Sequence, residues 1–273
     1  MGLFTEDMDT ERELSIERAL RSALALGEGF EVVYQPIYDA DGAKFSLAEA
    51  LLRLRDPLLG NVPPSEFIPV AERTGLICEI GYFVVETACA FIKRQENSFG
   101  SVSVNASAVQ FLKPDFADRV LEIAERHKIN ESQLMIELTE SMSCERRSVI
   151  ESNMLKLKSG GICVALDDFG TGYADIQTML LLPISAIKID KEYVQRINEN
   201  CAQLLIRSLV GLARSMGLQV IAEGVETHEQ RRLLWECGCD MLQGYLFSRP
   251  ICAADCERLN TRQSESGVRA ITF

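Results

Sequence analysis

Short apolar runs alternate with amphipathic segments along most of the chain. Eight of these runs have the length and apolar character of strands, and the segments between them repeat apolar residues at helical spacing. The predicted strands cover residues 30–34, 45–52, 102–105, 135–138, 163–167, 186–189, 220–222 and, with a weaker pattern, 241–244. Strands that alternate with helices are typical of a parallel sheet in an α/β fold.

Amphipathic segments between these runs predict the helices. They cover residues 11–26, 82–94, 115–127, 144–159, 174–181, 191–216 and 226–236. Another helix is predicted to open at Glu66 and Phe67, with Ser65 as its N-cap. The helices therefore fall between the strands, as in an α/β fold.

The first connection sets the direction of the first strand. The turn Asp39-Ala40-Asp41-Gly42 is far too short for a parallel crossover, so the first two strands are predicted to be antiparallel. About eight strands in a domain of this size predict a (β/α)₈ barrel. A doubly wound open sheet is the alternative, although no glycine-rich dinucleotide fingerprint follows the first strand.

Composition limits the classes of partner. The 273 residues are 47% hydrophobic, which is enough for one large domain or two small ones. The net charge of −12 disfavours nonspecific binding to a nucleic-acid polymer or to anionic lipid, so an anionic ligand needs metals or a few placed cations. Nine scattered cysteines are typical of a reduced cytoplasmic protein, and Cys237 and Cys239 with two histidines make a poor zinc site.

The chain ends carry few structural signals. The acidic start lacks the apolar core of a signal peptide, and we expect no membrane insertion because apolar runs stay short of about 18 residues. We expect a flexible segment over residues 1–10, one domain over 11–260 and a polar tail over 261–273. The predicted location is the cytoplasm.

Polar residues stand at or near the carboxyl ends of nearly all predicted strands. In order they are Glu49, Asn105, Glu137 with Glu140 just beyond, Asp167 and Asp168, Lys188 and Asp190, Glu223, and Gln243. In a barrel these ends converge on one mouth, where carboxylates about 4 Å apart repel by about 1 kcal/mol per pair in water and about 4 kcal/mol at an effective dielectric near 20. Oxygen ligands without histidine point to Mg²⁺ or Mn²⁺, and Asp167 is placed to bridge two ions.

Asp167 and Asp168 are adjacent, which raises a geometric problem. Successive strand side chains point to opposite faces, so both can serve one site only if the strand ends between them. Gly170 and Gly172 favour such an end. For one of the two acids, a turn or N-cap role is the alternative.

Several motifs of the chain, together spanning residues 17–250, resemble in order and spacing those of the EAL domain family of cyclic di-GMP phosphodiesterases. The matching motifs are Glu49-Ala50-Leu51-Leu52-Arg53, Ser103-Val104-Asn105, Glu137-Leu138-Thr139-Glu140, Asp167-Asp168-Phe169-Gly170-Thr171-Gly172-Tyr173, Lys188-Ile189-Asp190, Ala222-Glu223-Gly224-Val225-Glu226 and Gln243-Gly244-Tyr245-Leu246-Phe247-Ser248-Arg249-Pro250. The resemblance implies a modified TIM barrel with its first strand reversed, and hydrolysis of cyclic di-GMP to linear 5′-pGpG.

The resemblance also implies roles for single residues. One metal ion would be held by Glu49, Asn105, Glu137 and Asp167, and the second by Asp167 and Asp168. Glu223 and Lys188 would handle the attacking water. Arg53, Gln35 and Gln243 would contact the substrate, and Glu140, Asp190 and Glu226 would support the loops or the ligands, Glu140 by tethering the loop 169–173. Mg²⁺ or Mn²⁺ is expected to support hydrolysis and Ca²⁺ to inhibit it.

Several alternatives stay open from the sequence. Lys188 and Asp190 could form a simple ion pair, and Arg53 could be a solvated charge at the rim. A degenerate domain that binds cyclic di-GMP without cutting it, or a silent interaction module, would use the same fold. Leu54 and Ala174-Asp175 depart from the family pattern without touching a proposed ligand. The resemblance further implies a homodimer and an association with GGDEF or sensory domains in a longer protein.

Overall fold

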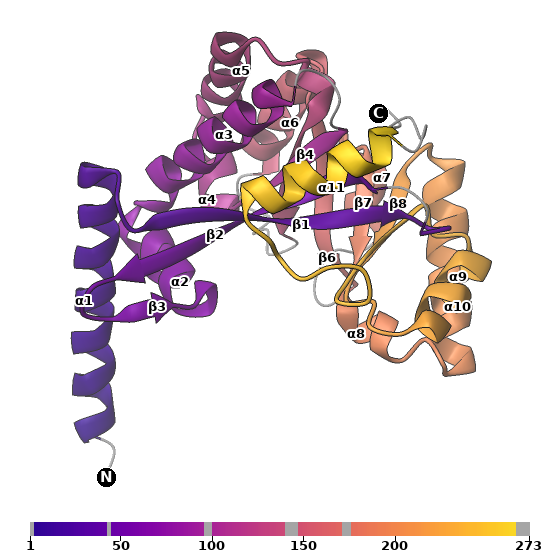
Figure 1. Cartoon of the computed structure of the whole chain (residues 1–273), viewed down its shortest axis with the longest axis horizontal. Helices are drawn as coiled ribbons and strands as arrows, with labels where there is room; N and C mark the ends of the chain where they lie inside the picture. Colours follow the sequence, from indigo (N-terminus) through magenta and orange to yellow (C-terminus); the bar gives the residue numbers. More distant parts are fainter. Residues whose placement is uncertain (1–2, 43–44, 96–99, 140–146, 171–175, 266–273) are drawn as a thin grey trace.

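A closed barrel organises the chain, whose computed structural model describes residues 3–42, 45–95, 100–139, 147–170 and 176–265 (Figure 1). Nine strands form one sheet in the order β1-β9-β8-β7-β6-β5-β4-β2-β3, and β1 also pairs with β2, which closes eight of them. The strands are β1 (Phe30–Asp39), β2 (Phe45–Asp56), β3 (Gly60–Val62), β4 (Ser101–Ala106), β5 (Leu134–Thr139), β6 (Cys163–Phe169), β7 (Ala186–Ile189), β8 (Gln219–Ala222) and β9 (Met241–Gln243).

The predicted barrel and the reversed first strand are confirmed. β1 runs antiparallel to both β2 and β9, whereas the pairs from β2–β4 round to β8–β9 are parallel. All eight predicted strands are present. The sequence missed β3, a three-residue strand that folds back on β2 and extends the sheet outside the closed barrel.

Helices cover the outside of the barrel (Figure 1). They are α1 (Leu3–Leu26), α2 (Pro64–Thr74), α3 (Ile77–Arg94), α4 (Ala108–Phe111), α5 (Phe116–His127), α6 (Arg147–Ser159), α7 (Ile176–Leu181), α8 (Lys191–Gln195), α9 (Asn200–Ser215), α10 (His228–Cys237) and α11 (Ala253–Glu265). α1 packs against α2 at one end of the molecule, and α11 lies across β1. None of the described helices combines the length and the apolar content that a membrane crossing requires.

Three helix predictions need correction. The single helix predicted over residues 191–216 is two helices, α8 and α9, because a turn between them places Ile197 in the core. The N-cap of α2 is Pro63 rather than Ser65, and Pro64 takes the first helical position, where proline loses no hydrogen bond. No helix was predicted after residue 236, but α11 covers Ala253–Glu265.

The barrel interior is apolar at one end and polar at the other. A separate cluster of seven buried side chains fills the interior near the amino ends of the parallel strands: Ile37, Leu47, Met135, Ala165, Ala186, Ile221 and Met241. A much larger core lies between the sheet and the helices. The interior cluster closes one end of the barrel and leaves the carboxyl ends of the strands for polar side chains.

Candidate metal centre

A two-residue repeat carries the polar side chains into the barrel mouth. Strand side chains alternate between faces, so a residue two positions beyond an interior apolar residue is also directed to the interior. The apolar and polar pairs are Leu47 and Glu49, Met135 and Glu137, Ala165 and Asp167, Ala186 and Lys188, Ile221 and Glu223, and Met241 and Gln243. β1 runs in reverse, so Gln35 precedes Ile37 by two residues and reaches the same layer.

Lys188 lies at the centre of this polar layer and is 1% exposed. Its Nζ is 2.5 Å from Glu223 Oε1, 2.7 Å from Glu137 Oε2, 3.3 Å from Asp167 Oδ1 and 3.6 Å from Glu49 Oε2. Burial alone would lower the pKa of Lys188, but the surrounding carboxylates, Asp167 first, raise it well above its ordinary value. Lys188 is therefore a buried ammonium that holds four carboxylates together.

Amide side chains from β4 and β9 orient Glu49. Asn105 Nδ2 donates to Glu49 Oε1 at 2.6 Å, and Gln243 Nε2 donates to Glu49 Oε2 at 2.6 Å. Gln243 Nε2 also donates to Gln35 Oε1 at 3.1 Å, and Gln35 Nε2 donates to the Ser248 carbonyl at 3.2 Å. Although burial opposes it, Lys188 and these amide donors hold the pKa of Glu49 below its ordinary value.

A bulge, and not a strand end, brings Asp167 and Asp168 together. β6 continues to Phe169, so the predicted end between the two acids is wrong. The β6–β7 register shifts between Leu166 and Phe169, and Asp168 has a left-handed backbone with φ 55°. A bulge re-aims one side chain of an adjacent pair, so both carboxylates reach one site. The Asp168 N–H donates to Asp167 Oδ1 at 3.0 Å.

Three carboxylates form a group that fits a metal ion. One oxygen each from Asp167, Asp168 and Glu223 lies within 4.8 Å of the other two. Burial, the neighbouring Asp167 and then Asp190 raise the pKa of Asp168 to about 6. Burial raises the pKa of Glu223 well above its ordinary value, and Lys188 only partly opposes this.

The charge balance of the cluster calls for more cations. Five carboxylates (Glu49, Glu137, Asp167, Asp168 and Glu223) face one ammonium, Lys188. Burial raises the pKa of Glu137 to about 8 against the pull of Lys188, and among the described residues Glu137 Oε1 is buried without a hydrogen bond. Hard divalent cations prefer such oxygen donors, so the residues present fit one or more ions of the Mg²⁺ type.

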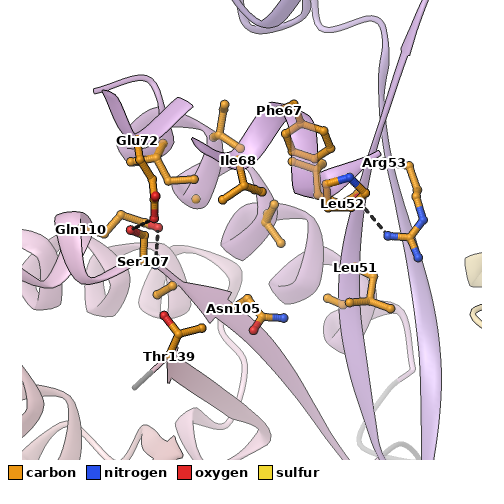
Figure 2. A pocket seen from close by; sticks show the side chains of 17 residues that line it. Leu51, Leu52, Arg53, Phe67, Ile68, Glu72, Asn105, Ser107, Gln110 and Thr139 are labelled. Atoms are coloured by element: carbon orange, nitrogen blue, oxygen red, sulfur yellow. Dashed lines mark hydrogen bonds between the residues drawn. The ribbon is translucent and has the colours of Figure 1, made fainter. Parts of the chain in front are cut away.

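A cavity of about 270 Å³ opens beside this cluster, between β2, α2, α3 and α4. Its walls are mostly apolar, with Leu51, Phe67 and Ile68 among them, and Arg53 and Asn105 also line it (Figure 2). Arg53 Nη1 donates to the Leu52 carbonyl at 2.9 Å. The cavity therefore combines apolar walls with a guanidinium group and the end of β4.

Asp190 lies beside the cluster, whereas other predicted site residues lie away from it or outside the described residues. Asp190 caps α8, accepting a hydrogen bond from the Glu192 N–H at 2.7 Å, and it is close enough to Asp168 to raise the pKa of that carboxyl. Glu226 is exposed, and its backbone N–H donates to Gln230 Oε1 at 2.8 Å. Glu140, Ala174-Asp175 and the loop segment 171–173 fall outside the described residues.

A polar group on the cavity wall was not predicted from the sequence. Ser107 Oγ donates to Glu72 Oε1 at 2.5 Å, and Gln110 completes a capping box with Ser107 at the start of α4 (Figure 2). Serine followed three residues later by glutamine is a readable capping signal. Glu72 gives no such signal, because its partner lies 35 residues away in the sequence.

The chain is similar to known proteins over most of its length. A model of the EAL domain matches residues 17–250. The chain is 37% identical over 246 residues to the oxygen sensor protein DosP of Escherichia coli, a match that covers 89% of this chain and 31% of DosP. It is 35% identical over 248 residues to a cyclic di-GMP phosphodiesterase of Pseudomonas aeruginosa, covering 90% of this chain and 42% of the relative.

A solved structure extends this similarity to the fold. The PaMucR phosphodiesterase in complex with c-di-GMP superposes with a TM-score of 0.82 at 33% identity, covering 89% of this chain and 99% of that chain. The chain thus spans less than half the length of the two curated relatives named above, and it matches nearly the whole of a solved domain.

Proposed function

Because the chain belongs to the EAL domain family, we propose that it is a metal-dependent phosphodiesterase that hydrolyses cyclic di-GMP to linear 5′-pGpG. The observation that carries the proposal is the buried group of Asp167, Asp168 and Glu223 beside Lys188, at the barrel mouth. A receptor without catalysis needs no such concentration of carboxylates. The named phosphodiesterase relative and the solved complex support the same substrate.

We assign the ions to two sets of donors. Glu49, Asn105, Glu137 and Asp167 would hold one Mg²⁺ or Mn²⁺, and Asp167 with Asp168 would hold the second. When bound, such ions lower the pKa of a coordinated water and neutralise phosphate charge. The buried amides of Asn105 and Gln243 keep Glu49 in one orientation, which favours a defined coordination geometry.

The chain's own residues account for proton movement. In hydrolysis, a bond forms between phosphorus and the water oxygen, and the bond from phosphorus to the 3′ oxygen breaks. Glu223, 2.5 Å from the Lys188 ammonium, would take the proton released by the water, and this pair would return one proton to the 3′ oxygen, which leaves as the hydroxyl of pGpG. The raised pKa of Glu223 favours proton acceptance.

The cavity beside Asn105 would position the substrate. Its volume and apolar walls suit one guanine base, and Arg53 on the same wall suits an adjacent phosphate. Orienting the base fixes the phosphate relative to the carboxylates and so reduces the entropy lost in reaching the transition state. The contacts proposed for Gln35 and Gln243 would act at the same mouth.

One incubation tests the proposal. The chain is mixed with cyclic di-GMP in Mg²⁺, Mn²⁺ or Ca²⁺, and both bound nucleotide and pGpG are measured. We expect pGpG in Mg²⁺ and Mn²⁺, but binding without cleavage in Ca²⁺, whose longer ligand distances of about 2.3 to 2.6 Å polarise water less. Glu223→Gln is the matched control, with an expected rate loss of roughly 10² to 10⁴ and retained binding.

The other outcomes lead to different conclusions. Binding without pGpG in every metal would make the chain a receptor, and no binding at all would make it an interaction module. We further propose that the chain acts in the cytoplasm, as a homodimer, and beside sensory or GGDEF domains. The 31% coverage of DosP, an oxygen sensor, supports this association with other domains.

A further inference from the structure

The short helix α8 touches both sides of the carboxylate group. It begins directly after β7, the strand that carries Lys188, and Asp190 caps its first turn. On one side its Tyr193 reaches the end of β6, where Asp167 and Asp168 lie. On the other side Lys191 packs against Gly224, next to Glu223, so closely that a Cβ on Gly224 would be 2.5 Å from Lys191 Cβ.

The hydroxyl of Tyr193 donates a hydrogen bond to the carbonyl of Gly170. Gly170 has φ 101°, a conformation that favours glycine, and an added Cβ would lie 2.8 Å from Tyr193 Cε2. The ring of Tyr193 therefore occupies the space that a side chain at position 170 would need. Both the contact and the hydrogen bond depend on a glycine at this point.

Gly170 lies two residues beyond Asp168, at the end of the β6 bulge. Backbone pairing between β6 and β7 is irregular from Leu166 to Phe169, so the sheet alone holds this stretch less firmly than a regular strand. Asp168 is also in the left-handed region, which is uncommon for a residue other than glycine. The hydrogen bond from Tyr193, which lies outside the sheet, therefore restrains the positions of the Asp167 and Asp168 carboxylates.

We infer that Tyr193 is a positioning residue whose hydroxyl fixes the Asp167–Asp168 bulge so that both carboxylates can bind one divalent cation beside Glu223. The inference rests on the proposed metal-dependent function. It goes beyond that function because Tyr193 acts on the ligands through the Gly170 carbonyl, to which its hydroxyl donates.

The test is Tyr193→Phe in the full chain, which keeps the ring and removes the hydroxyl. Loss of a residue that orients metal ligands typically lowers metal affinity by about 10-fold to 100-fold. We expect Mn²⁺ and Mg²⁺ affinity, measured by calorimetry without substrate, to fall by about this factor. The melting temperature of the metal-free protein should change little, and the KM for cyclic di-GMP should stay near that of the parent while kcat falls.

Two control variants separate positioning from packing. Val194→Ala truncates a fully buried side chain on the same helix and should lower the melting temperature with metal affinity unchanged. Tyr38→Phe removes a hydroxyl at the far end of β1 and should change neither quantity. Parental metal affinity in Tyr193→Phe, or an equal loss in Val194→Ala, would overturn the positioning role.

Failure of the proposed function is distinguishable from failure of this inference. If the parent binds neither ion, the metal site itself is wrong and the positioning role falls with it. If the parent binds ions without cutting cyclic di-GMP, the catalytic proposal fails. The affinity loss in Tyr193→Phe would still support the positioning role.

Discussion

At the scale of single residues, Lys188 compensates the charge of the buried carboxylates when no metal ion is bound. Its ammonium contacts four carboxylates within 3.6 Å, while its side chain is 1% exposed. Removing one partner from a buried charge pair costs about 3–5 kcal/mol, because the remaining charges lose their compensation. Divalent ions bound by the same carboxylates would supply that compensation instead.

We therefore expect Lys188→Met to lower the free energy of unfolding by about 3–5 kcal/mol in chelator, and by much less in Mg²⁺. Urea unfolding with and without Mg²⁺ measures both values. Lys156→Met is the matched control, because its pair with Asp118 is half exposed and worth at most about 1 kcal/mol. An equal loss in chelator and Mg²⁺ would show that the ion does not replace the lysine's charge.

The raised pKa of Glu137 predicts a pH dependence. Its pKa is about 8 in the metal-free fold, above the ordinary value of 4.5, so the folded state binds the extra proton between these values. The contribution of that proton to the free energy of unfolding is complete below about pH 4.5, and it is lost as the pH rises through about 8. Asp168, raised to about 6, acts in the same direction at lower pH.

A bound divalent ion requires these carboxylates ionised, so its affinity should rise with pH over the same window. We expect the melting temperature of the metal-free protein to fall from pH 6 to pH 8.5 and the increase caused by Mg²⁺ to grow. Thermal unfolding at several pH values, with chelator or Mg²⁺, measures this. In Glu137→Gln the pH dependence of the Mg²⁺ effect should weaken, and an unchanged profile there would assign the titration to another group.

The residue types of the site were readable from the sequence, because the two-residue repeat of strands places Glu49, Glu137 and Glu223 at one mouth. Their hydrogen bonds were not. Gln243 was expected to contact the substrate, and that contact stays a prediction. In the structure its amide on β9 donates a hydrogen bond to Glu49 on β2, past β1. Such a partner depends on barrel closure, which local sequence patterns do not encode.

At the scale of elements, close backbone contacts hold the strand ends in place. Gly244 follows Gln243 at the end of β9, and an added Cβ would be 2.0 Å from the carbonyl oxygen of Val225 and 2.3 Å from its nitrogen. Those are backbone atoms, which cannot rotate away as a side chain can. Any side chain at position 244 must therefore push β9 and the segment after Glu223 apart.

Gly244→Ala should lower the free energy of unfolding by about 1–3 kcal/mol or more and reduce pGpG formation, because Gln243 then loses its hold on Glu49. Gly211→Ala is the control within a helix. Gly211 is exposed in α9 with nothing within 4 Å of an added Cβ, so alanine should stabilise by about 0.8–1.0 kcal/mol with activity unchanged. A neutral Gly244→Ala would mean that the two segments separate without cost.

Element boundaries show where sequence patterns stop being informative. The apolar repeat ran through residues 191–216 as one helix, but Ile197 is drawn into the core and a turn separates α8 from α9. The bulge in β6 was hidden for a similar reason. Its left-handed residue is Asp168, not a glycine, so no glycine marks the point where the strand changes direction.

At the scale of the whole molecule, the barrel was predictable and the surface was not. Eight strand-like runs and one tight turn were enough for the closed sheet and its reversed first strand. Motif resemblance supplied the family, which the match over residues 17–250 confirms. Assembly depends on which apolar side chains remain uncovered after folding, and that required the structure.

Helices α7 and α9 carry exposed leucine side chains. Leu180 and Leu181 on α7 are 58% and 53% exposed, and Leu204 on α9 is 68% exposed. Exposed apolar side chains on a monomer are candidate positions for an interface between copies. α7 is also the first described helix after β6. A second copy bound there would therefore contact a segment that follows Asp167 and Asp168 closely in the sequence.

We expect the parent to sediment as a dimer and the variant carrying both Leu180→Glu and Leu204→Glu to sediment as a monomer, because four buried carboxylates at a symmetric interface would stay unpaired. Leu58→Glu is the control. Leu58 is 94% exposed in the turn between β2 and β3, on the α1 side of the molecule (Figure 1), and its replacement should leave the dimer intact. Sedimentation velocity at several protein concentrations measures the assembly, and circular dichroism checks that each variant is folded. A parent that sediments as a monomer at all concentrations, or a folded double variant that remains a dimer, would remove these leucines from the interface.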